Sequence, residues 1–126
     1  MSRRTRQRDA IRNAFERLDR PLSPQEVLDE ARDDADTLSL ATVYRALKSM
    51  AEEGEIVPVE VPGESPRYEV AGKAHHHHFH CRVCGRVFEM PGCVGARLDA
   101  LAPEGFVVED HELTLIGTCV ECARVA

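Results

Sequence analysis

Hydrophobic positions in the first half of the chain recur with the period of an α-helix, in three separate stretches. The stripes consist of Ile11, Phe15 and Leu18, then Val27, Leu28 and Ala31, and then Val43, Leu47 and Met50. Residues spaced in this way share one face of a helix and can pack on a common core. Ser23 forms a capping box with Glu26, Ser39 caps the third stretch, and Gly54 marks its end. The pattern predicts three short helices with tight connections, which is typical of a helix-turn-helix bundle.

From Ile56 onward the period of the apolar positions changes to two, as in β-strands. Residues 56–61 and 67–70 are expected to form a hairpin around the turn at residues 62–66, and Pro58 indicates an edge strand. Helices followed by a hairpin predict a winged helix. Residues 71–74, with the sequence Ala-Gly-Lys-Ala, are expected to be a hinge.

The second half of the chain is expected to be a small α/β domain. Strands are predicted at residues 78–81, 86–90 and 106–118, the last of which can contain a break, and a helix is predicted from about residue 94 to residue 102. About 50 residues are too few for an independent apolar core. We therefore expect a cross-link, such as a structural metal site, to stabilise this domain. The predicted fold class is α+β, with a winged-helix domain at residues 1–70, a hinge at 71–74 and an α/β domain at 75–126.

The net charge of −6 conceals a basic N-terminus. Residues 1–20 hold seven arginines against three acidic residues, whereas residues 21–66 hold three basic residues against eleven acidic ones. A basic arm on an acidic body suits contact with an anionic partner, and a solvated helix start explains the same charges equally well. No apolar run approaches the roughly 20 residues of a membrane helix, and the N-terminus lacks a secretory signal. A cytoplasmic protein without a membrane partner is therefore expected.

Four of the five cysteines form two Cys-x-x-Cys pairs, Cys81 with Cys84 and Cys119 with Cys122. Each pair can turn two thiolates toward one metal ion, and two pairs complete the closed tetrahedron of a structural zinc site. In a cytoplasmic chain, metal binding is favoured over disulfides. A redox pair is the other reading, but it usually begins a helix in a thioredoxin-like unit, which is not evident here. An iron centre has the same ligand set and stays open.

A run of four histidines precedes the first cysteine pair. On a strand, His76 and His78 would face one side, and His75 and His77 the other, so the run suits two imidazole pairs better than one site. Nitrogen ligands combined with carboxylates suit zinc, iron, manganese or nickel. Glu69 and Glu89 are candidate oxygen ligands. Cys93 and His111 are further candidates for the second imidazole pair.

Two other function classes are weighed against these sites. A zinc hydrolase needs an open coordination position and a positioned base, but the chain has no His-Glu-x-x-His motif and no sizeable pocket-building region. No catalytic residue and no organic small-molecule substrate are therefore assigned. A metal store or chaperone that uses the histidine run remains a remote alternative.

These motifs together resemble the ferric uptake regulator family of metal-dependent transcriptional regulators. The resemblance rests on residues 5–8 (Thr-Arg-Gln-Arg), 39–47 (Ser-Leu-Ala-Thr-Val-Tyr-Arg-Ala-Leu), 75–85 (the histidine run and first cysteine pair) and 119–122 (the second pair). It covers nearly the whole chain. It implies a homodimer that binds double-stranded operator DNA through the winged helix and dimerises through the α/β domain. The residues implied in DNA binding are Arg3, Arg8, Thr42, Tyr44 and Arg45.

The resemblance also implies three metal sites by position. The structural zinc ion, one per chain, is held by Cys81, Cys84, Cys119 and Cys122. The regulatory site at the hinge, for a second divalent metal, comprises Glu69, His76, His78 and Glu89. A possible third site comprises His75, His77 and His111, with Cys93 as a further candidate ligand.

Two departures from the family pattern affect the expected metal. The family's regulatory histidine before the second helix is replaced by Pro21, and its carboxylate ligand in the third site is replaced by Ala96. Cys93 lies three residues before Ala96 and can supply a thiolate, which favours Zn²⁺ over Fe²⁺ or Mn²⁺. However, zinc-sensing relatives usually carry a cysteine near residue 70, where this chain has Glu69.

We therefore expect a metal-responsive repressor that senses zinc and binds a pseudo-palindromic operator as a dimer. Iron-responsive and peroxide-responsive regulation are the alternatives within the family. The replaced histidine argues against peroxide sensing, and so does Glu89, where peroxide-sensing relatives typically have aspartate.

Overall fold

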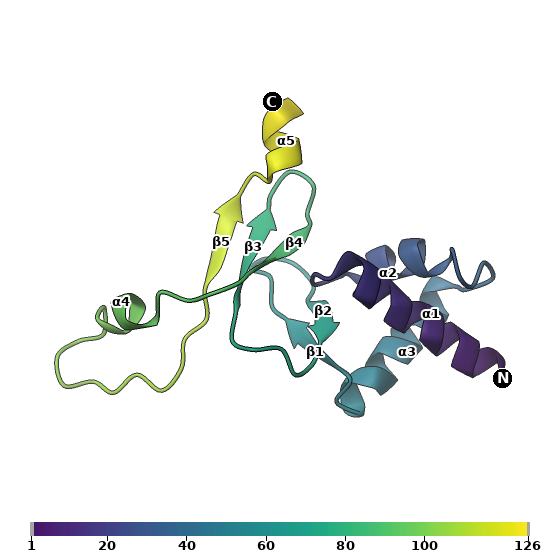
Figure 1. Cartoon of the computed structure of the whole chain (residues 1–126), viewed down its shortest axis with the longest axis horizontal. Helices are drawn as coiled ribbons and strands as arrows, with labels where there is room; N and C mark the ends of the chain where they lie inside the picture. Colours follow the sequence, from purple (N-terminus) through teal and green to yellow (C-terminus); the bar gives the residue numbers. More distant parts are fainter. Residues whose placement is uncertain (1, 126) are drawn as a thin grey trace. The chain divides into compact units, whose positions relative to one another are not determined.

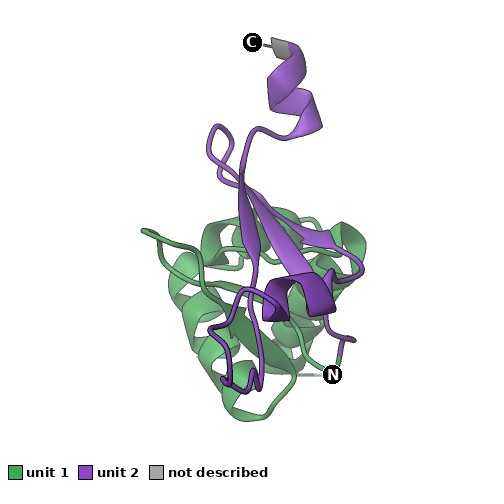
Figure 2. Ribbon diagram, turned by 90° about the vertical axis from the view of Figure 1, so that its left-hand side faces the viewer, with its two compact units in different colours: residues 1–72 green, residues 73–126 purple. Residues whose placement is uncertain are grey.

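The computed structural model describes residues 2–125 and divides into two compact units, residues 1–72 and residues 73–126 (Figure 2). In unit 1, three helices precede a two-stranded hairpin (Figure 1). These elements are α1 (Arg3–Leu18), α2 (Pro24–Ala31), α3 (Leu40–Glu52), β1 (Ile56–Val59) and β2 (Arg67–Val70).

The predicted helix starts are confirmed. The Ser23 hydroxyl accepts a hydrogen bond from the Glu26 backbone N–H at 3.2 Å, and the Glu26 carboxylate accepts one from the Ser23 N–H at 3.1 Å. Likewise, the Ser39 hydroxyl accepts a hydrogen bond from the Thr42 N–H at 3.2 Å. These bonds satisfy N–H groups that have no partner inside the helix, so the first turns of α2 and α3 are stabilised locally.

The apolar stripes of the three helices meet in one core. All the stripe residues named above except Leu18 are buried in it, and Leu18 packs against it. β1 and β2 pair in antiparallel fashion, with Ile56 opposite Val70, and Leu22 forms a bridge to Tyr68 that attaches the hairpin to the helices. Unit 1 is therefore a helical bundle with a hairpin, as the sequence pattern predicts.

Unit 2 is a three-stranded sheet with two short helices. Its elements are β3 (His77–Cys81), β4 (Val87–Met90), α4 (Gly95–Asp99), β5 (Thr114–Gly117) and α5 (Val120–Val125). The strand order is β4-β3-β5, with β4 antiparallel and β5 parallel to the central strand. The observed fold class is thus α+β, in agreement with the prediction.

The predicted strand at residues 106–118 is mostly wrong, since only Thr114–Gly117 is a strand. β5 pairs with β3 from His78 to Cys81, and β3 is itself only five residues long. Before β5, β3 reaches back to Leu113, whose carbonyl accepts a backbone hydrogen bond from the His78 N–H at 3.3 Å, and residues 106–112 form no ladder with it. The helix predicted to run to residue 102 ends earlier, at Asp99.

Unit 2 buries few apolar side chains. Within residues 73–124, the buried hydrophobic residues are Cys81, Val87 and Cys119, whereas unit 1 holds the whole main core cluster. Two of these three residues are cysteines of the predicted metal site. This sparse core agrees with the expectation that the second half of the chain needs a cross-link for its stability.

Candidate metal centres and nucleic-acid interface

The four paired cysteines lie together at one end of the unit 2 sheet. Cys81 ends β3, Cys84 lies in the turn to β4, Cys119 precedes α5 and Cys122 lies within α5. Their sulfur atoms all lie within 4.8 Å of one another. The Cys119 backbone N–H donates a hydrogen bond to the Cys81 sulfur at 3.3 Å, a contact that favours a thiolate.

The pKa values of these thiols show the electrostatic cost of bringing four of them together. Backbone hydrogen bonds from Cys84 and Cys119 lower the pKa of Cys81 to about 6. The pKa of Cys122 is raised to about 12, chiefly by its contact with Cys119 and then by burial. Four thiolates in this space require a cation to neutralise them. The cluster is therefore compatible with a structural zinc ion.

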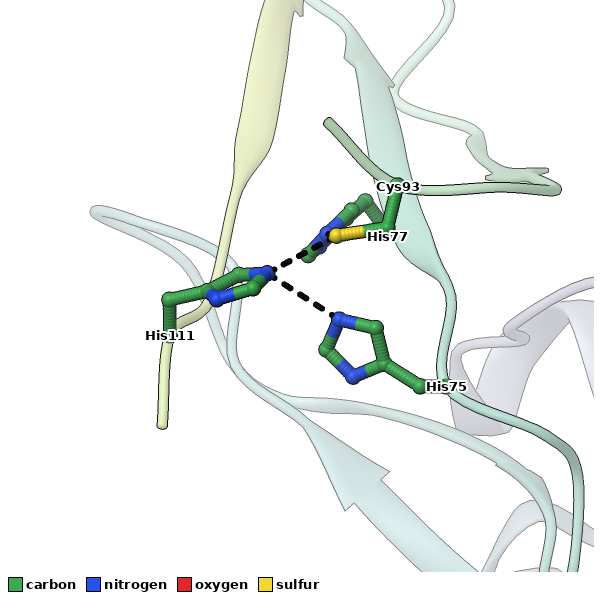
Figure 3. Close-up of side chains that lie close together, drawn as sticks. All are labelled: His75, His77, Cys93 and His111. Carbon is green, nitrogen blue, oxygen red and sulfur yellow. Dashed lines mark hydrogen bonds between the residues drawn. The ribbon is translucent and has the colours of Figure 1, made fainter. Parts of the chain in front are cut away.

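A second cluster consists of His75, His77, Cys93 and His111, whose ligand atoms also lie within 4.8 Å of one another (Figure 3). The Cys93 sulfur lies 2.9 Å from Nε2 of His111 and 3.2 Å from Nε2 of His77. Nε2 of His75 lies 3.1 Å from Nε2 of His111. The residues come from three places along the chain: the start of β3, the turn after β4 and the segment before β5.

His77 is the buried member of this cluster, with 3% of its surface exposed. Burial lowers the pKa of His77, and the neighbouring imidazoles, His75 first, lower it further. A neutral imidazole has a free nitrogen lone pair, which is the form that binds metal ions. The lowered pKa therefore favours the form of His77 that can bind a metal ion.

The third candidate site contains His76, His78 and Glu89 on the other face of the sheet strands. Nε2 of His76 and Nε2 of His78 lie 3.1 Å apart, and a Glu89 carboxylate oxygen lies 3.9 Å from Nε2 of His76. The same carboxylate forms an ion pair with Lys73, which the sequence analysis did not single out. Glu69 belongs to unit 1, on β2, so its participation in this site stays a prediction.

The residues predicted to contact DNA lie on α1 and α3. Tyr44 is exposed over 57% of its surface, and Arg45 is exposed and donates to the Thr42 hydroxyl at 3.0 Å. A groove of about 670 Å³ runs between the two helices. It is lined by Arg3, Arg4, Gln7, Arg8, Thr42, Arg45, Ala46 and Ser49.

Arg8 differs from the other arginines of this groove. Its guanidinium donates to the Glu53 carboxylate at 3.0 Å and to the Ser49 hydroxyl at 2.7 Å. These bonds connect α1 to the end of α3, so part of the hydrogen-bonding capacity of Arg8 is used within the protein. Arg4 was not singled out from the sequence, although it lies one helical turn before Arg8 and the i,i+4 spacing was available as a signal.

Residues 2–116 match the sequence profile of the ferric uptake regulator family. The chain belongs to this family. A zinc uptake regulation protein of Mycobacterium tuberculosis is 37% identical over 125 residues, which cover 95% of this chain and 94% of that protein. The chain is a metal-responsive transcriptional regulator, and members of the ferric uptake regulator family are not enzymes.

Solved structures of the ferric uptake regulator family share the fold. The Helicobacter pylori ferric uptake regulator, described with three functional metal-binding sites, is 28% identical with a TM-score of 0.72, over 93% of this chain and 79% of that one. A zinc-bound manganese uptake regulator is 27% identical with a TM-score of 0.82, over 95% of this chain and 90% of that one. None of the helices described in residues 2–125 is long and apolar enough to cross a membrane.

Proposed function

We propose that this protein is a cytoplasmic zinc-responsive repressor that binds a pseudo-palindromic operator as a metal-loaded homodimer. The observation that carries the choice of zinc is the Cys93 sulfur, which lies among three imidazoles. Thiolate is a softer ligand than carboxylate and favours Zn²⁺ over Fe²⁺ and Mn²⁺. The 37% identity to a zinc uptake regulation protein supports the same choice.

The four-cysteine cluster would hold a structural zinc ion, one per chain. It connects the β3–β4 turn to α5 in a unit that buries few apolar side chains. A closed four-thiolate site contributes directly to folding stability, because the ligands are brought together only in the folded chain. We therefore assign the role of this site to stability rather than to sensing.

Unit 1 corresponds to the predicted DNA-binding domain of residues 1–70. It would bind DNA through α3 and the groove between α1 and α3. Exposed Tyr44 and Arg45 are available to an external partner, and Arg3 and Arg4 add positive charge in the same groove. Arginine contacts to phosphate supply affinity that depends on salt, and contacts to base edges supply specificity. An acidic protein can therefore bind DNA through a locally basic surface.

A second copy of the chain would cover the apolar side chains of residues 101–116. In this stretch Leu101, Phe106, Val107, Leu115 and Ile116 are all exposed. Proteins that act as monomers rarely leave so many large apolar groups in water. Proteins of the ferric uptake regulator family bind operator DNA as dimers, so this half of the chain is the dimerisation domain that we propose.

Regulation would occur at the hinge site of Glu69, His76, His78 and Glu89. A divalent metal bound there would favour one arrangement of the two domains around the hinge at residues 71–74. The equilibrium shifts only as far as the metal binds that arrangement more tightly than the others. Because Lys73 pairs with Glu89, a metal ion that binds this carboxylate must compete with the ammonium group of Lys73.

The decisive experiment is fluorescence anisotropy with the promoter DNA of the protein's own operon. The protein would carry only its structural zinc, and free Zn²⁺ or Mn²⁺, as a substitute for Fe²⁺, would be buffered and titrated. Tight binding at trace free zinc, with manganese ineffective, is expected. Binding driven by micromolar manganese would instead identify an iron-type regulator, the alternative that Glu69 favours. No tight binding at any metal level would contradict a DNA-binding function.

His78→Ala tests the hinge site within this proposal. We expect it to leave the dimer and the structural zinc content intact, while metal-dependent binding of the operator weakens. Sedimentation velocity, zinc analysis and the anisotropy titration measure these three properties. Unchanged operator binding at saturating metal would remove His78 from the regulatory site.

A further inference from the structure

The cluster of His75, His77, Cys93 and His111 contains as many ligands as a closed tetrahedral site needs. Three Nε2 atoms and one sulfur converge, with neighbouring atoms 2.9 to 3.2 Å apart where a contact is formed. In a tetrahedron with zinc–nitrogen and zinc–sulfur bonds of usual length, the corresponding edges are about 3.4 Å and about 3.5 Å. An expansion of about 0.3 to 0.6 Å along these contacts would therefore accommodate the ion.

The short helix α4 supplies no ligand but contacts two of the four. At its start, the Gly95 backbone N–H donates to the Cys93 sulfur at 3.2 Å. At its end, a carboxylate oxygen of Asp99 lies 3.4 Å from Nδ1 of His111. Ala96, between them, has a side chain that cannot bind a metal. In this chain, therefore, the carboxylate of Asp99 contacts the candidate ligand His111. Cys93 stands in for the carboxylate ligand that Ala96 cannot supply.

We propose that, at the third metal site implied by the family resemblance, Cys93 is the ligand that makes the centre closed and zinc-selective, and Asp99 positions His111. The inference deepens the proposed zinc response, but it concerns the centre itself and can be tested without DNA. Cys93 acts as a ligand, and Asp99 acts only through the imidazole of His111.

The selectivity follows from ligand number and softness. Zn²⁺ accepts four nitrogen and sulfur ligands in a closed tetrahedron, whereas Mn²⁺ prefers oxygen ligands and octahedral geometry. With the protein supplying three imidazoles and one thiolate, the centre lacks the carboxylate oxygens that suit Mn²⁺. Co²⁺, which reports tetrahedral geometry and sulfur ligation in its absorption spectrum, is the natural probe.

Asp99 fits the usual partner of a metal-bound histidine. A ligating imidazole generally donates its second N–H to a carboxylate, which fixes the ring and raises its basicity. A tautomer with the proton on Nδ1, toward Asp99, would leave Nε2 of His111 as the acceptor nitrogen that faces Cys93 and His75. Asp110 provides a matched comparison, because its carboxylate accepts a hydrogen bond from the backbone N–H of His111 at 2.8 Å rather than from the ring.

The test is a Co²⁺ titration of full-length protein that retains zinc in the four-cysteine site. The wild type is expected to show an intense tetrahedral visible spectrum together with a sulfur-to-cobalt charge-transfer band. Within residues 2–125, Cys93 is the cysteine outside the four-cysteine cluster, so this band reports its ligation. Absence of the band in the wild type would overturn the proposal without recourse to any variant.

Substitutions separate the two roles. Cys93→Ala should abolish the charge-transfer band and weaken zinc binding at this centre about 100-fold, whereas Cys93→Asp should narrow or reverse the preference for zinc over manganese. Asp99→Asn should weaken zinc binding about 10-fold and keep the band, while Asp110→Asn should change neither. Affinities would be measured by competition with a chromophoric chelator, with circular dichroism as the folding control.

The outcomes distinguish this inference from the proposed function. A metal-dependent operator response without the cobalt–sulfur band would refute the centre and leave the repressor standing. Conversely, the band without operator binding would support the centre and refute the repressor. Equal effects of Asp99→Asn and Asp110→Asn would remove the positioning role of Asp99.

Discussion

Individual arginines on unit 1 have different roles despite their common charge. Arg45 lies exposed on α3 and is directed by a local bond to Thr42, whereas Arg8 spans two helices through Glu53 and Ser49. A side chain that is held inside the protein contributes to stability, and one that faces solvent is available to a partner. The two residues were grouped as DNA contacts from the sequence, and the contacts of Arg8 now set them apart.

Arg45→Ala is expected to weaken operator binding by about 1–3 kcal/mol without lowering stability. Arg8→Ala should lower the free energy of unfolding by about 1 kcal/mol, because it removes one ion pair and one hydrogen bond between helices. Anisotropy at several salt concentrations and urea unfolding measure the two effects. Equal loss of stability in both variants would contradict the division of roles.

At the level of elements, two ion pairs attach α1 to the segment that directly follows α3. Arg8 contacts Glu53, and one turn further along, Arg12 makes two bonds to the Glu55 carboxylate, at 2.8 and 3.1 Å. These pairs fix the angle between α1 and the helix that carries Tyr44 and Arg45. Their formation depends on residues more than forty positions apart, which no local pattern encodes.

The Arg12 pair makes stability depend on pH. The hydrogen bond from Arg12 lowers the pKa of Glu55 below its ordinary value. A carboxyl group whose pKa is lowered on folding stabilises the protein above its unfolded pKa, about 4.3, and the contribution is lost as pH falls through the folded value. Because both side chains are about one-third exposed, we expect a small effect, about 0.5 kcal/mol at pH 7.

Glu55→Gln is the variant that measures this contribution. Urea unfolding should show the full difference from the wild type at pH 7, and a shrinking difference as the pH is lowered below about 4. The ion pair between Arg12 and Asp9 remains in this variant and serves as an internal control. A difference that stays constant down to acidic pH would contradict the assigned cause.

For the whole molecule, the two units differ in how they are stabilised. Unit 1 has a continuous apolar core, whereas unit 2 has a sparse core, clusters of candidate metal ligands and exposed large apolar side chains such as Phe106 and Val107. The first unit is therefore expected to owe most of its stability to apolar burial. The second is expected to require metal and a second copy of the chain for its full stability.

Val107→Asp tests the proposed dimer. Val107 is 85% exposed, so a charge there should leave the fold of the single chain unchanged and weaken self-association at least tenfold. Sedimentation velocity over a range of concentrations measures the monomer–dimer equilibrium. Val57→Asp, at an exposed valine of β1 in unit 1, is the control. An unaltered dimer in the Val107 variant would place the interface elsewhere.

The sequence by itself determined the features that depend on neighbours along the chain. Helix caps at Ser23 and Ser39, the apolar stripes and the alternation of the histidine run follow from local backbone geometry, because one turn of helix or two residues of strand define which side chains meet. The spacing within each Cys-x-x-Cys pair is local in the same sense. The fold class and the family resemblance were both inferred from these local features.

Only the tertiary structure decided which distant residues complete each site. It brought Cys93 and His111 to the histidines of β3, directed Asp99 to His111, and placed Lys73 on Glu89. It also limited β5 to four residues, because a strand extends only as far as its neighbour provides backbone partners. Such contacts depend on chain segments that are adjacent in space and remote in sequence, so pattern and spacing indicate the candidate ligands but not their arrangement.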